Sequence, residues 1–488
     1  MPFSVRVFYL LLLLIFLAEG LGIAYGREVS FFLIVAAPFF LFSLDYQQKF
    51  AVKLPKTLAV LVLFFLVLIA ASIVTAVNVQ IAFEQSLLYL SLFLMLFFVA
   101  NHQQEINKYL VRFIMSLAIV LVAYSVVLRL FNLYKIPLLS PTPGYQLIFP
   151  SYGGHNHLGD FLALALVIYF YNLFKEGFKI KSALWPALFV PPFLLSFSRS
   201  AYLSVFATLP VIGLLLFKRG KLQLFSSRLT LLVTLTAVGI FIYVAIVLSL
   251  SSVWEAQYVP IFDDVNQTLK RSLQIYNKGL SGSRIDYLGQ ALQSIAAHPL
   301  SGVGSGNFIT VSYRYAENSY LVAASSHNLF FDIFSENGVP AGVVFSAILL
   351  LIAKRSKKGL AWLLFLALLI NFQTDYTHRL YSMLLLFFVL AGLVYQEENK
   401  VTARFLQPVL YLEMLIVLLM LSSFVLVKNK QYRLAFYSYP LNSRVFPPLI
   451  EDSLKQGKKE EALSWMRIYG TFFPIARQFS FPNVQKTE

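Results

Sequence analysis

Runs of apolar residues separated by short polar segments make up most of this chain. A helix that crosses a membrane needs about 20 predominantly apolar residues, and by that criterion the pattern predicts thirteen spans. We expect them near residues 7–26, 29–44, 57–77, 81–99, 110–131, 156–174, 182–197, 200–217, 229–250, 328–353, 359–373, 379–396 and 405–427. The seventh contains Pro186, Pro191 and Pro192, so we expect it to be kinked or broken. The predicted fold class is an all-α polytopic membrane protein with 12 or 13 transmembrane helices.

Composition supports a membrane protein and excludes several other classes. The 488 residues are 58% hydrophobic and 13% charged, whereas soluble domains are roughly half apolar and about a quarter charged. These values exclude an ordinary soluble enzyme and a disordered chain. The chain contains no cysteine, which excludes disulfides, thiolate metal ligands and cysteine nucleophiles.

Lysine and arginine are distributed unevenly between the two sides that the spans define. With a cytoplasmic N-terminus, the inner segments hold 19 of these residues and the short outer segments hold five. This asymmetry fits the positive-inside rule and predicts that the N-terminus is cytoplasmic. The net charge of +16 is then largely a consequence of membrane topology, and we expect no nucleic-acid partner.

Two long hydrophilic segments divide the chain into four regions. We expect a first bundle of about nine spans at 1–250, an extracytoplasmic loop domain at 251–327, a second bundle of about four spans at 328–427 and an amphipathic C-terminal tail at 428–488. The tail contains QGKKEEALSWMRIYGTFFP at 456–474, which looks like half of a tetratricopeptide unit. Thirteen spans place this tail on the outer side, whereas one span fewer would place it in the cytoplasm.

The unusual polar residues gather on the predicted outer face, and the first group is GGHNHLGD at 153–160. His155 and His157 are two residues apart and so point to different faces of a helix, which disfavours a metal site. Asn156 and Asp160 belong to the same helix start. Two other interpretations stay open: polar residues satisfied by water and backbone, or a helix N-terminus that receives an anionic ligand.

A second group, SFSRSA at 196–201, contains Arg199 between the seventh and eighth spans. An arginine at the membrane edge usually faces a cavity or a partner, because its transfer into lipid is costly. It can also extend to a lipid phosphate. The residues alone leave both interpretations open.

The loop domain contains a predicted amphipathic helix that starts at Arg284, after Gly282 and Ser283. Its apolar stripe consists of Tyr287, Leu288, Ala291, Leu292 and Ile295. HPLSGVGSGNF follows at 298–308, and its proline and glycines predict a tight turn. The segment does not match the phosphate-binding P-loop pattern.

The third group opens the span at 328–353 with the sequence SSHNLFFDIFSENGVPAG. Asn328, Asp332 and Glu336 are spaced by four residues and therefore share one helix face. His327 precedes them, and histidine can accept a proton near neutral pH. Alternatively, this histidine has no catalytic role and lies at the membrane interface with its hydrogen bonds satisfied. Later in the chain, Asp375, His378 and Arg379 form an outer charged cluster in which we expect an ion pair that stabilises a short turn.

In this order and on one membrane side, these motifs resemble the O-antigen ligase and O-antigen polymerase family, which are polytopic glycosyltransferases of the C superfamily. The matching pieces are GGHNHLGD, SFSRSA, SGSR, HPLSGVGSGNF and HNLFFDIFSENG, and they span roughly residues 150–345. The chain departs from the family in three places. Ser283 is inserted in the SGR motif, His155 stands where proline is more common, and a thirteenth span is predicted where ligases typically have twelve.

The resemblance implies transfer of a glycan from undecaprenyl diphosphate to an acceptor hydroxyl at the outer face of the bacterial cytoplasmic (inner) membrane. It implies that Arg199 and Arg284 bind the donor diphosphate, since the guanidinium fork matches phosphate oxygens. His327 would be the catalytic base, with Asn328 or Asp332 orienting it. The resemblance further implies a pocket that includes Asn156, His157, Ser198 and Gly304.

These roles describe an inverting, metal-independent transfer without a cofactor. The implied partners are the lipid-linked glycan donor, membrane lipids and an acceptor that is lipid A-core, a glycan or a protein. Ligase activity onto lipid A-core is the leading interpretation, and polysaccharide polymerase and protein O-oligosaccharyltransferase are the alternatives within the family.

A membrane transporter or lipid flippase is the alternative from another class. It would show repeats between the two halves and ionisable residues near the bilayer midplane, whereas the histidines and acids here cluster at outer ends. The enzyme interpretation predicts instead that Arg199, Arg284 and His327 surround one outward cavity.

Overall fold

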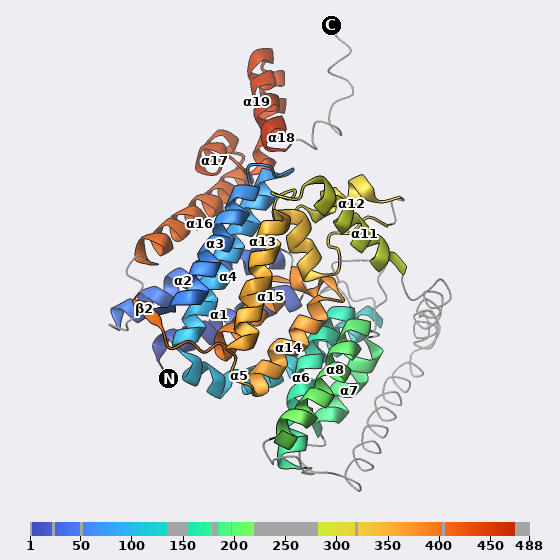
Figure 1. The fold of residues 1–488 in the computed structure, drawn as a ribbon. Coiled ribbons are helices and arrows are strands. Elements are labelled where there is room, and N and C mark those ends of the chain that lie inside the picture. The colour runs from blue at the N-terminus through green and yellow to red at the C-terminus, as the bar shows by residue number, and fades with distance from the viewer. Residues whose placement is uncertain are drawn as a thin grey trace. The chain divides into compact units, whose positions relative to one another are not determined.

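The computed structural model describes residues 2–21, 25–48, 52–133, 155–177, 184–196, 198–218, 282–317, 321–402 and 406–473. Within these residues the chain is almost entirely helical and has one two-stranded sheet (Figure 1). Eight helices are long and apolar enough to cross a membrane, and four shorter apolar helices accompany them. Together they match twelve of the thirteen predicted spans, and the remaining span, at 229–250, lies outside the described residues. The all-α polytopic fold class is therefore confirmed.

The helices begin and end close to the predicted positions, because hydrophobic length is a local signal. The eight long helices are α1 (Phe3–Gly20), α2 (Gly26–Gln47), α4 (Val79–Asn101), α5 (Gln103–Leu133), α6 (His155–Glu176), α8 (Arg199–Lys218), α13 (Leu329–Lys354) and α16 (Leu406–Lys428). The four shorter apolar helices are α3 (Lys56–Ser72), α7 (Leu184–Leu195), α14 (Leu360–Phe372) and α15 (Tyr381–Val394).

Two helices depart from a simple span. α7 has 12 residues and continues through Pro191 and Pro192. At 1.5 Å per residue it is only about 18 Å long, which is shorter than the hydrocarbon core of a bilayer. α13 is interrupted at Gly338, whose φ is 82°. A Cβ at that position would lie 2.3 Å from the carbonyl oxygen of Leu300, so this glycine lets the loop backbone approach the helix closely.

The chain is divided into two compact units, each assembled from three separate segments. Unit 1 consists of Met1–Leu33, Met95–Gly282 and Ile352–Gln396. Unit 2 consists of Ile34–Leu94, Ser283–Leu351 and Glu397–Glu488.

In unit 1, the segments with a predicted outer position lie at one end of α15. The carboxylate of Glu19, at the end of α1, accepts hydrogen bonds from the backbone N–H groups of Tyr381 (3.0 Å) and Ser382 (2.7 Å). The guanidinium of Arg27, at the start of α2, lies 5.0 Å from the centroid of the Tyr381 ring. These contacts place the end of α1 and the start of α2 next to the start of α15.

The segments with a predicted inner position lie at the other end of α15. The side-chain amide of Gln103, at the start of α5, donates to the backbone carbonyls of Gly392 and Tyr395, each at 2.7 Å. Ser356, after α13, forms an isolated bridge with Tyr395. Within unit 1, the segments named here that are predicted to be outer lie at one end of α15, and those predicted to be inner lie at the other end. Which of these ends faces the cytoplasm is predicted from the Lys/Arg distribution.

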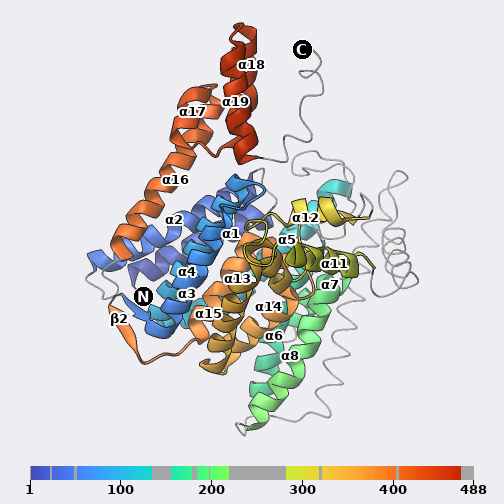
Figure 2. The same ribbon diagram turned by 45° about the horizontal axis from the view of Figure 1, so that its top comes forward.

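In unit 2, a short antiparallel sheet joins two segments with a predicted inner position. β1 (Lys53–Pro55) pairs with β2 (Lys400–Thr402), with Leu54 opposite Val401. The hydroxyl of Thr57 donates to Glu397 at 2.6 Å beside this pair. α3 starts directly after β1, and α16 follows β2 and leads to the C-terminal tail (Figures 1 and 2). α3 and α16 therefore both begin next to the sheet and extend away from it.

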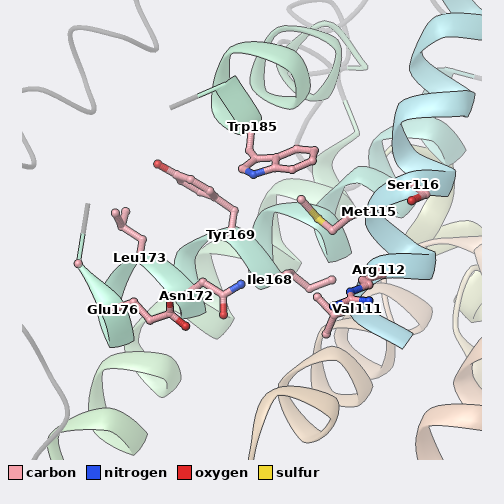
Figure 3. A pocket seen from close by; sticks show the side chains of 11 residues that line it. Val111, Arg112, Met115, Ser116, Ile168, Tyr169, Asn172, Leu173, Glu176 and Trp185 are labelled. Carbon is pink, nitrogen blue, oxygen red and sulfur yellow. The ribbon is translucent and has the colours of Figure 1, made fainter. Parts of the chain in front are cut away.

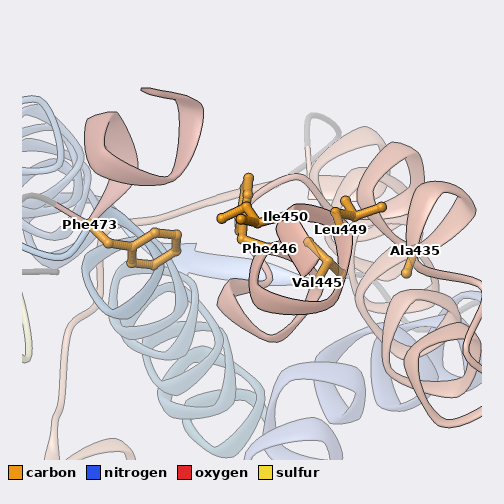
Figure 4. Close-up of a cluster of buried hydrophobic side chains, with 6 residues drawn as sticks. All are labelled: Ala435, Val445, Phe446, Leu449, Ile450 and Phe473. Atoms are coloured by element: carbon orange, nitrogen blue, oxygen red, sulfur yellow. The ribbon is translucent and has the colours of Figure 1, made fainter. Parts of the chain in front are cut away.

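The C-terminal tail is helical up to Phe472. It contains α17 (Tyr432–Ser438), the 3-10 turn η5 (Ser443–Val445), α18 (Phe446–Lys455) and α19 (Lys459–Phe472). α18 and α19 are joined through Gly457, whose φ is 70°. The buried core of the tail is shown in Figure 4 and consists of Ala435, Val445, Phe446, Leu449, Ile450 and Phe473. The predicted helix in QGKKEEALSWMRIYGTFFP is α19, and it packs with α18 as one helix pair.

The tail and the loop domain both contact the start of α4. The hydroxyl of Tyr439 donates to Glu84 at 3.3 Å, and the N–H of Ser443 donates to Gln80 at 3.0 Å. Directly before α4, the N–H of Val77 donates to the carbonyl of Val303 in the loop domain at 3.1 Å. Because α3 leads from the sheet toward this turn, the tail and the loop domain share the side opposite the sheet.

This arrangement predicts the labelling of single cysteines, which the natural chain lacks. Glu317→Cys in the loop domain and Ser464→Cys in α19, both at exposed positions, should react with a membrane-impermeant maleimide in intact spheroplasts. Thr402→Cys in β2 should react only after permeabilisation. If Glu317→Cys and Ser464→Cys are labelled from opposite sides of the membrane, the loop domain and the tail do not share one side. If both of these cysteines react only after permeabilisation, the loop domain and the tail face the cytoplasm, which is opposite to the predicted orientation.

Candidate active site

Arg199 is the first residue of α8, in unit 1. Its side chain is exposed, while those of its neighbours Ser198 and Ser200 are buried. The hydroxyl oxygen of Ser198 accepts a hydrogen bond from the N–H of Ala201 at 3.3 Å and so caps the first turn of α8. The two serines therefore anchor the backbone on either side of Arg199.

The buried carboxylate of Asp160, on α6, holds these two serines. Asp160 is 1% exposed, and its Oδ1 accepts hydrogen bonds from the hydroxyls of Ser198 (2.8 Å) and Ser200 (2.9 Å). The amide of Asn371 on α14 donates to the same oxygen at 2.7 Å, and the hydroxyl of Thr377 donates to Oδ2 at 2.6 Å. A buried carboxylate is tolerated only with such a set of donors. Asp160 thereby joins α6, α8, α14 and the turn before α15.

Beside Asp160, α6 lies very close to the segment between α7 and α8. A Cβ at Gly159 would lie 2.1 Å from the hydroxyl oxygen of Ser196, so only glycine fits the position. The buried face of α8 continues with small residues, including Ala201 and Ser204. Small side chains at a helix interface allow two backbones to pack tightly in a membrane. Because serine side chains are short, the hydroxyls of Ser198 and Ser200 contact Asp160 only when the backbones are this close.

His157 and Tyr376 extend this polar cluster in unit 1. His157 is 2% exposed, its Nδ1 lies 3.6 Å from Oδ2 of Asp160, and its ring meets that of Tyr376 edge-on with 4.7 Å between centroids. Tyr376 belongs to the 3-10 turn η4 (Tyr376–Arg379). Burial, together with the charges of Asp375 and Asp160, raises the pKa of Tyr376 to about 12. Its hydroxyl is therefore protonated and available as a donor at neutral pH.

The cluster contains polar atoms that no described residue satisfies. Oδ1 of Asn156 and Oδ1 of Asn371 are buried and have no hydrogen-bond partner among the described residues. Such atoms call for water or a polar ligand. No set of three His, Asp or Glu side chains in the described part of the chain is arranged to hold a metal ion.

Unit 2 contains α11 (Gly282–Ala297), which carries Arg284 and Tyr287 on the same face, one turn apart. The prediction of a helix here is confirmed, but part of its predicted apolar stripe is wrong, since Leu292 is 51% exposed. The buried face includes the polar residues Gln290 and Ser294. Gln290 is buried because its side chain tethers the following loop: its amide donates to the carbonyl of Leu321 at 3.1 Å, and its oxygen accepts from the hydroxyl of Ser312 at 2.7 Å.

The glycine-rich segment after α11 is a tight turn, as predicted. Gly302, Gly304 and Gly306 have φ values of 62°, 91° and 76°, a region that side chains disfavour. The carboxylate of Glu336 on α13 accepts hydrogen bonds from the N–H groups of Gly306 (2.8 Å) and Phe308 (3.1 Å). The N–H of Gly304 donates to the backbone carbonyl of Glu336 at 2.8 Å. The turn is therefore folded around one acidic residue of the membrane helix.

His327 lies just before α13, in a turn that Asp332 holds. One carboxylate oxygen of Asp332 accepts from the hydroxyl of Ser325 and the other from the N–H of Ser326, both at 2.7 Å. Ser325 in turn accepts a hydrogen bond from the N–H of His327 at 3.0 Å. Oδ1 of Asn328 caps α13 by accepting from the N–H groups of the next helical turn. Asp332 and Asn328 thus position the backbone on both sides of the histidine.

The ring of His327 is held by an aromatic neighbour on α11. It stacks on the ring of Tyr287, with 5.2 Å between centroids and 15° between planes. The backbone of His327 has a φ of 60°, which is uncommon for a residue other than glycine and costs roughly 1–2 kcal/mol. Strained residues of this kind often occur at functional sites. Arg284 lies one helical turn from the residue that contacts His327.

The predicted site residues fall into two groups. Asn156, His157, Ser198 and Arg199 belong to unit 1, and Arg284, Gly304, His327, Asn328 and Asp332 belong to unit 2. In unit 1, His157 and Ser198 both contact Asp160. In unit 2, His327 lies in the turn that Asp332 holds, and it stacks on Tyr287, one helical turn from Arg284. The gathering of Arg199 with Arg284 and His327 around one cavity stays a prediction, because it concerns both units.

The sequence analysis missed three roles. Asp160 was recognised only as part of a helix start, although an acid in an apolar helix indicates a functional or structural site by itself. Tyr287 was assigned to an apolar stripe, and no local pattern marks it as a partner of His327. The sequence also did not indicate that the carboxylate of Asp375 accepts hydrogen bonds from the N–H of Tyr376 (2.8 Å) and the hydroxyl of Ser200 (3.2 Å); the expected ion pair of Asp375 stays a prediction.

Comparison with known proteins gives one family. The O-antigen ligase family model (Wzy_C) matches residues 183–346, from the start of α7 to the middle of α13. This range includes Arg199, Arg284 and His327, together with the glycine-rich turn. No curated protein and no solved structure matches the chain.

The geometry of the glycine-rich turn predicts that Gly304→Ala destabilises the protein by roughly 2–4 kcal/mol. The new Cβ would lie 2.4 Å from the Cβ of Ala76, at a φ of 91°. Gly289→Ala is a matched control, since Gly289 is helical and has no atom within 4 Å of the added carbon. We expect the control to be neutral or stabilising by up to about 1 kcal/mol. Thermal unfolding in detergent measures both, and equal midpoints would contradict this account.

The cluster around Asp160 generates a second stability prediction. Asp160→Ala removes the acceptor that four buried donors share, so we expect a loss of roughly 3–5 kcal/mol. Asp160→Asn keeps one acceptor oxygen and should fall between the alanine variant and the natural protein. Asp452→Ala, at an exposed position in α18, is the control and should change stability by less than about 0.5 kcal/mol. An Asp160→Ala variant that unfolds at the midpoint of the control would refute this role for Asp160.

Proposed function

We propose that this chain, a member of the O-antigen ligase family through its domain at residues 183–346, transfers a glycan from undecaprenyl diphosphate to an acceptor hydroxyl at the outer face of the cytoplasmic membrane. The family match supports glycan transfer of the O-antigen ligase or polymerase type, by a glycosyltransferase-like membrane enzyme. The observation that carries the finer proposal is the arrangement in unit 2. There, one helix supplies both Arg284 and the ring that holds His327.

The donor requires stabilisation of its leaving group. When the bond between the anomeric carbon and the phosphate oxygen breaks, the electron pair moves to that oxygen and the diphosphate gains negative charge. Arginine can bind two phosphate oxygens at once and stays charged at any physiological pH. We assign this role to Arg199 and Arg284. Fixed positive groups aimed at developing charge are an effective source of catalysis in a site of low dielectric constant.

Ser198 and Ser200 support this role for Arg199. Both hydroxyls are held by Asp160, so the backbone of Arg199 is fixed at the start of α8 while its side chain extends outward. An arginine whose backbone is already fixed loses less conformational freedom when it binds the donor. Asp160 is therefore a positioning residue in this mechanism, and it does not need to touch the substrate.

The acceptor requires removal of its proton. In the proposed step, Nδ1 or Nε2 of His327 takes the hydroxyl proton as the acceptor oxygen attacks the anomeric carbon, on the side opposite the diphosphate. The new glycosidic bond then has inverted configuration. The stack on Tyr287 and the turn held by Asp332 keep the imidazole in a defined place. Positioned general bases contribute roughly 10²–10⁴-fold to reaction rates.

Lipid A-core is the proposed acceptor, which makes the protein an O-antigen ligase. A polymerase or a protein O-oligosaccharyltransferase would use the same two arginines and the same histidine. The distinction lies in the product: a ligase transfers one preassembled chain once, whereas a polymerase extends a chain repeatedly. The acceptor must reach His327, so residues of the loop domain contribute to its selection.

Donor turnover tests the proposal directly. The purified protein is incubated in EDTA with undecaprenyl-diphosphate-linked glycan and either lipid A-core or a second donor molecule, and release of undecaprenyl diphosphate is measured. His327→Asn should reduce release at least about 100-fold, and Arg284→Lys should reduce it by about 10-fold or more, because lysine lacks the bidentate fork. One product band indicates a ligase, and a ladder indicates a polymerase.

Matched controls in the same loop domain distinguish catalysis from folding. His298→Asn, directly after α11, and Arg314→Lys, at an exposed position in α12 (Phe308–Tyr315), should retain normal turnover. Equal loss in the control variants would show that the assay reports stability. Normal turnover in His327→Asn would refute the general-base role.

A further inference from the structure

A cavity of about 450 Å³ lies within unit 1 between α5, α6 and α7. Figure 3 shows α5 on one side of it, α6 below it and Trp185 of α7 above it. Its apolar walls include Met115, Ile168, Leu173 and Trp185. A volume of this order is typical of sites for small amphipathic ligands.

The polar residues of the cavity lie toward one end of α6. Glu176 is the last residue of this helix, Asn172 lies one turn before it, and Ile168 lies one turn deeper. Arg112 of α5 faces the same end, and Figure 3 shows it with Asn172 on the side opposite Trp185. From Glu176 to Ile168 the cavity follows α6 over about 12 Å. The cavity is therefore amphipathic, with charges at its rim and apolar walls beyond them.

One buried hydroxyl in the cavity wall has no partner. Tyr169 is 4% exposed, and its hydroxyl has no hydrogen-bond partner among the described residues. Buried hydroxyls are nearly always paired, so an unpaired one calls for a ligand or ordered water. A buried hydroxyl in the wall of such a cavity can donate a hydrogen bond to an ester oxygen of a lipid.

The position of the cavity excludes a role in the proposed active site. It lies at the end of α6 that carries Lys175, which the Lys/Arg distribution predicts to be cytoplasmic. The opposite end of the same helix carries Asn156, His157 and Asp160. Asp160 and Asn172 are separated by about 18 Å along α6. Trp185, in the wall of the cavity, is a residue type that is typical of a membrane interface.

We propose that this cavity binds one zwitterionic glycerophospholipid of the cytoplasmic leaflet. An acyl chain fills the space between Met115, Ile168 and Trp185. The phosphate lies at the guanidinium of Arg112, and the ammonium of the head group lies at Glu176. One cation and one carboxylate at the same rim match a head group that carries both charges. The bound lipid joins α5, α6 and α7 at the predicted inner face.

Native mass spectrometry of the full-length protein tests this inference. The protein is purified in mild detergent and equilibrated with an equimolar mixture of phosphatidylethanolamine, phosphatidylglycerol and undecaprenyl phosphate. We expect one retained phosphatidylethanolamine per chain. Arg112→Ala should lower its occupancy at least tenfold, and Met115→Trp should do the same by filling the cavity. Lys108→Ala, at another exposed position on α5 that does not line the cavity, is the matched control and should retain the lipid.

Each other outcome overturns the proposal. Retention of no lipid, or equal occupancy in all variants, would show that the cavity is not a lipid site. Preferential retention of phosphatidylglycerol would refute the zwitterionic head group, and retention of undecaprenyl phosphate would make the cavity part of the donor path. Donor turnover by Arg112→Ala should stay normal, which establishes that this variant is folded and separates the lipid site from the proposed transfer reaction.

Discussion

The carboxylate of Asp160 is the constraint on which the predicted outer end of unit 1 depends. It is buried in a protein where charge is expensive, yet it is tolerated because hydroxyl and amide groups from three other segments donate to it. The glycine beside it and the small residues of α8 let the helices come near enough for serine to reach. Removal of this single acceptor would leave α6, α8 and α14 without the bonds that align their ends. The place of Arg199 depends on that alignment.

In unit 2, buried carboxylates again accept hydrogen bonds, here mainly from backbone N–H groups. Asp332 and Glu336, one turn apart on α13, accept hydrogen bonds from two turns of the loop domain. The first turn carries His327, and the second is the glycine-rich turn. The membrane helix therefore acts as a rigid support for irregular backbone, whose N–H groups need acceptors wherever water is scarce. Reactive groups on such loops keep a defined geometry because an acid of the scaffold holds the loop backbone.

Hydropathy alone predicted most of the fold, since each span depends only on its own residues. The span predicted at 328–353, for example, is α13 (Leu329–Lys354). The candidate residues His327 and Asp332 were also visible, because charged groups at apolar helix starts are rare. Arg284 was a candidate through the family resemblance. Their contacts were not visible. Asn371 and Thr377 meet Asp160 across more than 200 residues of sequence, and β1 and β2 have three residues each, too short for a periodic signal. Long-range pairing of polar side chains has no local signature.

The β1–β2 pairing has a consequence for biogenesis. The strands are about 345 residues apart in the chain, so a ribosome working at roughly 5–20 residues per second needs about 20–70 s between them. During that interval α3 and α4 reside in the bilayer without α16 and the tail that complete their unit. The early helices must therefore persist as an unfinished assembly, exposed to lipid or to insertion factors, until the end of translation. Unit 2 is therefore completed only after β2 and the tail have been synthesised, and a nascent chain truncated before β2 cannot complete it.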